Sequence, residues 1–227
     1  MDDFASYKAC SIDEVATRLP PREAVTLVRE FRRRSAGGRR VTVYSDGCFD
    51  MFHIGHARQL EQIKKMFANA ELIVGVCSDE DIVHNKGSNV MNNKERCESV
   101  RHCKWVDRIV FPAPWTPTLK FMDEHGIDFV AHDTLPYAVE GSQDCYAPMK
   151  EAGRFIPTLR TEGISTTELL VRILKSREDF YERNLKKGYS RESMNLNYLE
   201  YCYIQMRGVV HNVQNCLKQE KEAGYQA

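Results

Sequence analysis

Two periods of apolar residues alternate along this chain, one typical of strands and one of helices. Short apolar runs predict five buried strands, at residues 41–44, 72–77, 109–111, 129–131 and 155–159. The stretches between them carry apolar residues at helical spacing; Ala57, Leu60, Ile63 and Phe67 form one such stripe. Strands that alternate with helices predict right-handed crossovers and a parallel sheet.

This pattern predicts one α/β domain over residues 40–175, with a Rossmann-like, doubly wound, parallel five-stranded sheet flanked by helices. Gly126 and Gly153 each follow a helical stretch just before a strand, where glycine commonly ends a helix. Residues 1–39 are predicted to be an N-terminal helical and basic segment, and residues 176–227 a C-terminal helical extension. Ligands of such sheets bind beyond the carboxyl ends of the strands, where the strand order reverses.

The N-terminal segment combines a helix with a basic stretch. After two prolines at 20 and 21, Ala24, Leu27, Val28 and Phe31 recur at helical spacing, which predicts a short helix docked on the core. The arginines at 32–34 and 39–40 flank a Ser-Ala-Gly-Gly joint. Composition favours a solvated linker there, while a nuclear address or a phosphate-steering patch stays open.

The C-terminal extension carries a narrow apolar seam. Its members repeat at spacings of 3 and 4: Leu199, Cys202, Met206, Val209, Val213 and Cys216. This spacing predicts a helix that packs on a second copy of the chain or on another partner. Residues 190–227 contain four lysines or arginines and four glutamates, so we expect weak or no association with membranes.

Composition limits the class of protein. The chain has 227 residues, of which 42% are hydrophobic and 28% charged, so it is globular rather than disordered or fibrous. Its 32 basic and 32 acidic residues cancel, and any binding of polyanions must therefore be local. The eight cysteines include no CxxC pair, which indicates free thiols. With no signal-like or membrane-spanning apolar run, we expect a cytoplasmic protein, with a nuclear location open.

The loop after the first strand, residues 46–56, carries the strongest chemical signal. His53, Gly55 and His56 form an HxGH motif at a helix start, where two imidazoles lie beside unpaired backbone N–H groups. Such a site suits the phosphates of a nucleotide, and the glycine would let a phosphate approach the backbone. Seven histidines and 13 glycines in 227 residues give about 0.01 such motifs by chance. A purely structural histidine pair stays open.

A second helix start follows the last strand, in residues 160–168. Ser165 and Glu168 have the spacing of a capping box, behind Arg160 and Gly163. A capped helix alone would explain this pattern, but two anion-accepting helix starts at one sheet edge favour a shared triphosphate site. Lys86 lies in a polar loop before a helix predicted to begin near Asn92. By itself a loop lysine is a weak signal.

Aromatic residues follow the next two strands. Trp115 lies in a proline-stiffened loop, and Tyr137 and Tyr146 follow His132 and Asp133. Aromatic faces joined by a carboxylate form the cage that quaternary ammonium ions prefer. Scattered aromatic residues are more often part of a core, and composition alone leaves that alternative open.

Residues 40–175 resemble the cytidylyltransferases of phospholipid synthesis, and specifically the choline-phosphate cytidylyltransferase family. The matching segments are SDGCFDMFHIGHARQL, LIVGVCSDED, HNKGSNVMNNKER, APWTPT, DFVAHDTLPY and RTEGISTTELL. HxGH alone marks a wide superfamily of nucleotidyltransferases, whereas HxGH joined to RTEGIST is narrow. The resemblance implies that CTP and phosphocholine react to give CDP-choline and pyrophosphate, by in-line attack without a covalent enzyme intermediate.

The resemblance also implies roles for individual residues. His53, His56, Lys86 and Arg160 would act in catalysis, with Lys86 bridging the phosphates of both substrates. Phosphocholine would contact Asp46, Lys86, Trp115, Tyr137 and Tyr146. CTP would contact Cys48, Phe49, His53, His56, Lys86, His132, Asp133, Tyr137, Arg160, Thr161, Glu162, Gly163, Ile164, Ser165 and Thr166. Mg²⁺ would accompany CTP, and no metal ligand is assigned to the chain.

The resemblance further implies a homodimer. Residues 104–107 read KWVD, which departs from the RYVD usual in the choline family and resembles the ethanolamine enzymes at the family's dimer contact. A phosphoethanolamine cytidylyltransferase is the nearest alternative because that family shares both signature motifs, although APW at residues 113–115 follows the choline enzymes. A catalytically silent CTP-binding homologue is a second alternative, while a tRNA-charging enzyme is disfavoured because no KMSKS-like partner is present.

Overall fold

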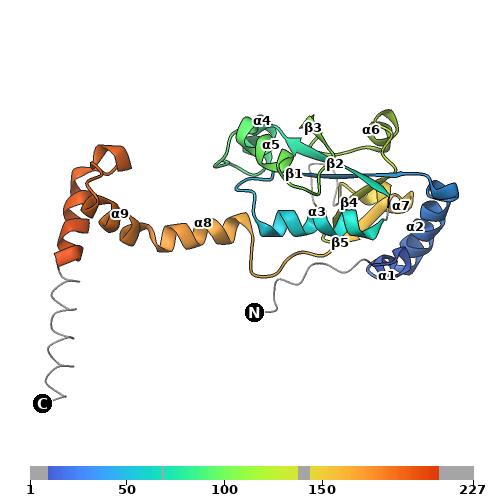
Figure 1. Cartoon of the computed structure of the whole chain (residues 1–227), viewed down its shortest axis with the longest axis horizontal. Coiled ribbons are helices and arrows are strands. Elements are labelled where there is room, and N and C mark those ends of the chain that lie inside the picture. The colour runs from blue at the N-terminus through green and yellow to red at the C-terminus, as the bar shows by residue number, and fades with distance from the viewer. Residues whose placement is uncertain (1–9, 68, 138–143, 210–227) are drawn as a thin grey trace, which may run out of the picture. The chain divides into compact units, whose positions relative to one another are not determined.

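The structure, a computed structural model, contains a five-stranded, fully parallel sheet (Figure 1). It describes residues 10–67, 69–137 and 144–209. The strands are β1 (Val41–Gly47), β2 (Ala70–Cys77), β3 (Arg108–Ala113), β4 (Phe129–Asp133) and β5 (Phe155–Thr158). Their order is β3-β2-β1-β4-β5, with β1 pairing β2 and β4 in parallel. The predicted α/β class and all five predicted strands are confirmed.

Helices cover both faces of the sheet. One face packs against α1 (Ile12–Ala16), α2 (Pro21–Arg34), α3 (Ile54–Met66) and α5 (Asn93–Arg101), and the other against α6 (Leu119–Glu124) and α7 (Ala147–Glu151). The short helix α4 (Asp79–Asn85) follows β2. Val43 and Tyr44 of β1 are fully buried in different clusters because successive side chains of a strand point to opposite faces. The chain reverses its strand order at β1 and β4, so the edge beyond these strands is where a ligand is expected.

The N-terminal helix α2 docks on the core as its spacing predicts, since Leu27 is only 1% exposed. The basic stretch after it is not simply a solvated linker. Arg34 and Arg39 both pair with the buried carboxylate of Asp128, which also accepts a hydrogen bond from the Thr42 backbone. These contacts fix the segment beside the start of β1 and β4.

Contacts divide the chain into two units, Met1–Thr166 and Thr167–Ala227. The domain boundaries predicted at residues 39 and 175 stay predictions. The second unit contains α8 (Thr166–Lys175), which begins at the unit boundary, α9 (Arg177–Lys186) and helical residues 198–209. In the seam, Leu199, Met206 and Val209 are exposed, and Val213 and Cys216 lie outside the described residues. The helical extension is confirmed, whereas its packing partner stays a prediction.

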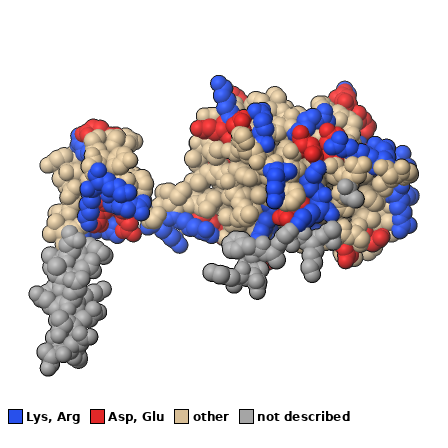
Figure 2. Space-filling view, viewed as in Figure 1, with Lys and Arg blue, Asp and Glu red and all other residues tan. Residues whose placement is uncertain are grey.

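Charged residues of both signs are interspersed over the visible surface (Figure 2), as the balanced composition indicates. Among the described residues, the structure contains no helix both long and apolar enough to cross a bilayer.

Two glycines at the ends of helices test how α2 packs. Gly126 and Gly153 both have positive φ, at 64° and 68°, but a Cβ on Gly126 would meet nothing within 4 Å. On Gly153 it would lie 2.6 Å from the backbone oxygen of Thr26 in α2. We expect Gly126→Ala to cost about 1–2 kcal/mol in unfolding free energy from backbone strain alone. Gly153→Ala should cost about 1–3 kcal/mol more, because α2 must also shift. Urea unfolding of both variants measures the difference, and equal losses would contradict the described packing of α2.

Candidate active site

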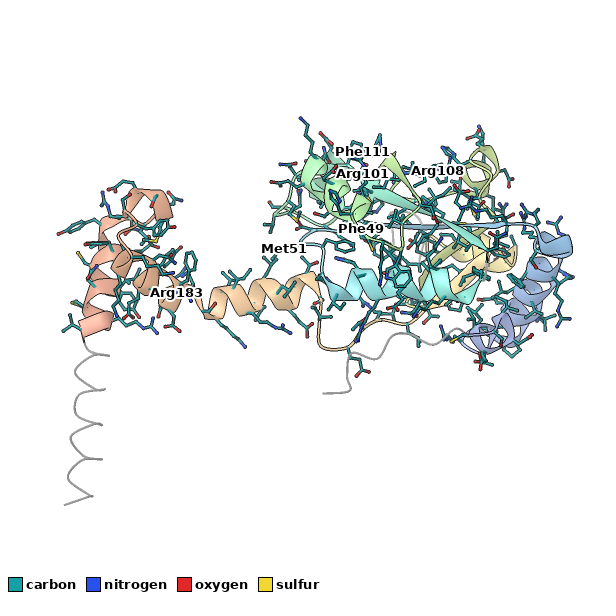
Figure 3. The ribbon with its side chains drawn as sticks, in the orientation of Figure 1. Phe49, Met51, Arg101, Arg108, Phe111 and Arg183 are labelled. Atoms are coloured by element: carbon teal, nitrogen blue, oxygen red, sulfur yellow. The ribbon has the colours of Figure 1, made fainter. Side chains whose placement is uncertain are left out.

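The loop between β1 and α3 forms a strained turn that begins the site. Phe49 and Met51 have positive φ of 53° and 47°, which is uncommon for bulky residues, and both are labelled in Figure 3. The carboxylate of Asp50 between them accepts hydrogen bonds from the backbone N–H groups of Val90 and Met91, at 2.9 and 2.8 Å. The strain is therefore balanced by bonds to the loop that precedes α5.

Arg96 connects the same loops through hydrogen bonds and an ion pair. Its side chain is fully buried, and its guanidinium donates to the carbonyl oxygens of Cys48 at 2.6 Å and Cys77 at 2.8 Å. It also pairs with the carboxylate of Asp79 at 2.8 Å and donates to the carbonyl of Met91 at 3.1 Å. One cation therefore fixes the ends of β1 and β2, the start of α4 and the loop before α5. Sequence reasoning missed both Arg96 and Asp50.

The two motif histidines cap helix α3. Nδ1 of His53 accepts a hydrogen bond from the Gly55 N–H at 3.1 Å, and Nδ1 of His56 accepts one from the His53 N–H at 3.3 Å. Their rings stack with centroids 3.9 Å apart. The histidine pair therefore has the structural role that the sequence left open. Because Nδ1 accepts a hydrogen bond, the hydrogen of a neutral ring lies on Nε2, and each Nε2–H is a donor.

Burial controls the charge of His56. Desolvation, with smaller contributions from the neighbouring His53 and Lys86, lowers the pKa of His56 to about 3. The ring is therefore neutral at physiological pH. Gly55 lies against the ring of His53, since a Cβ at this position would lie 2.8 Å from Cε1 of His53. The glycine thus makes room for the histidine ring.

The loop after β5 lies against the loop between β1 and α3. Its start is held by Gln62 of α3, which exchanges two hydrogen bonds with the Leu159 backbone, at 2.7 and 2.8 Å. At its end, the Thr166 hydroxyl donates to the carbonyl oxygen of Asp50 at 3.1 Å, and a methyl group of Ile164 lies against Gly55. The two predicted phosphate loops are therefore neighbours.

The other residues of this loop lie nearer the solvent. Arg160 is mostly exposed, and its Nε lies 3.3 Å from the carboxylate of Asp133. Thr161 is half-buried, Glu162 and Gly163 are exposed, and Ser165 is half-buried.

Lys86 lies directly after α4 with its ammonium group between several predicted site residues. The ammonium is 5.7 Å from the ring centre of Trp115 and 5.2 Å from that of Tyr137. The Cys48 sulfur and the Tyr137 hydroxyl are close enough to the ammonium to change its pKa. Desolvation alone lowers the pKa of Lys86, but the Cys48 sulfur and the Tyr137 hydroxyl outweigh it and raise the pKa. The two aromatic faces therefore surround a cation.

A buried carboxylate lies deeper, at the end of β1. The Tyr146 hydroxyl donates to both oxygens of Asp46, at 3.1 and 3.2 Å, and the Tyr146 ring stacks on His132 at 4.9 Å. Burial raises the pKa of Asp46, although His132 and the Tyr146 hydrogen bond oppose this shift. Nδ1 of His132 is buried without a hydrogen-bond partner. The His132 ring lies between Tyr146 and Tyr137, and Tyr137 contacts Trp115. Tyr146 is therefore not a third exposed ring of the predicted aromatic cage.

Comparisons with known proteins show which family the chain resembles. A family model described as "Cytidylyltransferase-like" matches residues 44–172. The "Choline-phosphate cytidylyltransferase A" of Homo sapiens is 47% identical over 196 residues, which are 86% of this chain and 53% of that protein. The "Probable choline-phosphate cytidylyltransferase" of Schizosaccharomyces pombe is 49% identical over 181 residues, 80% of this chain and 50% of the other. The chain thus spans about half the length of these relatives.

A relative with another name is more distant. The "Ethanolamine-phosphate cytidylyltransferase" of Dictyostelium discoideum is 43% identical over 140 residues, which are 61% of this chain and 38% of that protein.

The tautomer and charge of His56 give a direct prediction. We expect a neutral ring with hydrogen on Nε2 at pH 5, because its pKa of about 3 lies well below the ordinary value. Two-bond ¹⁵N–¹H correlation spectra of the folded protein would show this, with the urea-unfolded chain as control. Since the unfolded chain binds this proton first, the contribution of His56 to stability is lost as pH falls from about 6.5 towards 3. A protonated ring at pH 5, or hydrogen on Nδ1, would contradict the capping geometry.

Proposed function

The chain belongs to the cytidylyltransferase-like family, and from that premise we propose that it transfers the cytidylyl group of CTP to phosphocholine, releasing pyrophosphate. The observation that carries the choice of substrate is the pair of ring faces, Trp115 and Tyr137, around the ammonium of Lys86. Ring faces that accept one cation also suit a trimethylammonium group. The names of the relatives described above support the same choice.

We assign the phosphate chemistry to donors rather than to a base. The Nε2–H groups of His53 and His56 would donate to phosphate oxygens as charge builds on the attacked phosphorus, and the neutral state of His56 suits a donor. Lys86 would shift from Cys48 and Tyr137 to the phosphates of both substrates, where it offsets their repulsion. Arg160 and Thr166 would hold the triphosphate from the second loop. Catalysis would then consist of positioning and charge stabilisation.

Phosphocholine would lie with its cation between Trp115 and Tyr137 and near Asp46. A buried carboxylate whose pKa is raised by burial gains stability when a cation approaches, so Asp46 would favour the charged headgroup. Cys48, Phe49, His132 and Asp133 would frame the nucleotide.

Mg²⁺ would enter with CTP. Among the described residues, no three His, Cys, Asp or Glu side chains are grouped so that they could hold the ion. Phosphate oxygens and water supply ligands that this ion prefers, so the metal belongs with the substrate in this proposal.

Three further features stay proposals. A homodimer would pair through the segment at residues 104–107, where the Lys104 ammonium lies 4.6 Å from the ring centre of Trp105. Membrane association would be weak, because the charges of residues 190–227 cancel. The protein would act in the cytoplasm or the nucleus.

The test of the function is pyrophosphate release from CTP with either phosphocholine or phosphoethanolamine. We expect a kcat/KM at least about tenfold higher for phosphocholine, equivalent to about 1.4 kcal/mol, because aromatic faces prefer the quaternary ammonium. Choline without its phosphate should give no pyrophosphate. A preference for phosphoethanolamine would favour the ethanolamine alternative, and CTP binding without turnover would favour a silent homologue.

Removal of the Trp115 ring should affect phosphocholine binding and CTP binding differently. We expect Trp115→Ala to raise the KM for phosphocholine by about 3- to 30-fold, because one ring face contributes about 0.5–2 kcal/mol. The KM for CTP should change by less than about twofold. Trp115→Phe keeps an aromatic face and is the matched control. Equal effects of Trp115→Ala on both KM values would mean that this ring does not hold the headgroup.

A further inference from the structure

Cys48 and Cys77 lie side by side at the edge of the sheet that forms the site. β1 and β2 pair in parallel with Gly47 opposite Val76, and each cysteine is the next residue in its chain. Neighbouring strands lie about 4.8 Å apart, and disulfides join Cα atoms about 4.4–6.8 Å apart. The register alone therefore places the two backbones within the range of a disulfide.

Arg96 holds the pair in this position. Its guanidinium binds the carbonyl oxygens of both cysteines, at 2.6 Å for Cys48 and 2.8 Å for Cys77. The Cys77 side chain also lies close enough to that of Cys48 for each thiol to shift the pKa of the other. The two thiols are thus neighbours, and a shared buried cation limits how far the two chain segments can separate.

The two sulfurs have different surroundings. Cys48 is partly accessible, whereas Cys77 is only 3% exposed. The neighbouring Cys77 thiol, together with Lys86 and Arg96, lowers the pKa of Cys48 to about 6, while the Cys48 thiol and burial raise the pKa of Cys77. Cys48 is therefore suited to attack an oxidant, and Cys77 to react with Cys48 afterwards.

We propose that Cys48 and Cys77 form a redox-sensitive dithiol at the active site, which a hydroperoxide converts into a disulfide. The Cys48 thiolate attacks one peroxide oxygen, the O–O bond breaks, and Cys48 becomes a sulfenic acid while hydrogen peroxide loses hydroxide. The Cys77 sulfur then attacks the Cys48 sulfur, the S–O bond breaks, and the thiol proton leaves with hydroxide as water. Two thiols lose two electrons, and one hydrogen peroxide becomes two waters.

The disulfide would change the environment of Lys86. In the reduced protein the Lys86 ammonium lowers the pKa of Cys48, and the Cys48 sulfur raises the pKa of Lys86. If CTP binds here, a step that rests on the proposed function, its phosphates compete with the thiolate for this ammonium. Bound CTP should therefore disfavour the thiolate and slow oxidation.

The test uses the full reduced chain, treated with hydrogen peroxide at pH 7, quenched with an alkylating agent, digested and analysed by mass spectrometry. We expect a peptide pair joined through Cys48 and Cys77 as the main disulfide, formed at least about tenfold faster than oxidation of Cys103, whose pKa burial raises. Dithiothreitol should reverse it. Disulfides only among other cysteines, or equal oxidation of Cys48 and Cys103, would overturn the proposal.

Variants separate the roles of the two sulfurs. In Cys77→Ser, Cys48 should stop at the sulfenic acid and be trapped by dimedone. Lys86→Met should slow oxidation of Cys48 several-fold, because the thiolate loses a neighbouring cation. Cys103→Ser is the matched control and should form the Cys48–Cys77 bond at the wild-type rate.

Repeating the oxidation in the presence of CTP tests the dithiol separately from the proposed function. Millimolar CTP should slow formation of the bond. A bond that forms at the same rate with and without CTP would overturn the link to the nucleotide but not the dithiol, whereas absence of the bond in a protein that releases pyrophosphate would overturn the dithiol alone.

Discussion

The buried guanidinium of Arg96 is the interaction on which the site depends. The loop after β1 contains two non-glycine residues with positive φ, so it does not hold its shape unaided. Arg96 offers five donors in a rigid fork, and its partners come from three separate segments, at Cys48, at residues 77–79 and at Met91. Asp50 completes the same network from the other side. The histidine caps, the Lys86 ammonium and the two cysteines are all placed by segments that this network joins.

The sequence predicts the sheet and the motif residues because their signals are local. Apolar runs of strand length, glycines at helix ends and the HxGH spacing each lie within a few residues of one another. Arg96 was missed because its role depends on hydrogen bonds to carbonyl groups up to 48 residues away in the sequence. The spacing of residues along the chain does not reveal such contacts. One signal was present: Arg96 and Val100 lie four residues apart on the buried face of α5, where an arginine is unusual. The pairing of Cys48 with Cys77 became visible only through the strand register.

Charges at the site are arranged by burial and proximity rather than by net composition. The chain is neutral overall, yet Lys86 lowers the pKa of both Asp46 and Cys48, and Cys48 in turn raises the pKa of Lys86. His56 is kept neutral by the same desolvation. In the low dielectric of a partly buried site, a partly desolvated ammonium attracts an anion more strongly than it would in water. Lys86 lies beside both ring faces of Trp115 and Tyr137, so in the proposed reaction one lysine would contact both substrates.

The CTP dissociation constant of Arg96→Lys, measured by calorimetry against Arg101→Lys, tests this account most directly. Arg101 lies on the same helix but is exposed, and it pairs only with Glu98 three residues before it among the described partners. A lysine at position 96 keeps the charge but cannot form the fork, so we expect the folded variant to bind CTP at least about tenfold more weakly. Arg101→Lys should bind within about twofold of the wild type. If Arg96→Lys folds and binds CTP as tightly as Arg101→Lys, the site does not depend on Arg96, and the central claim is wrong.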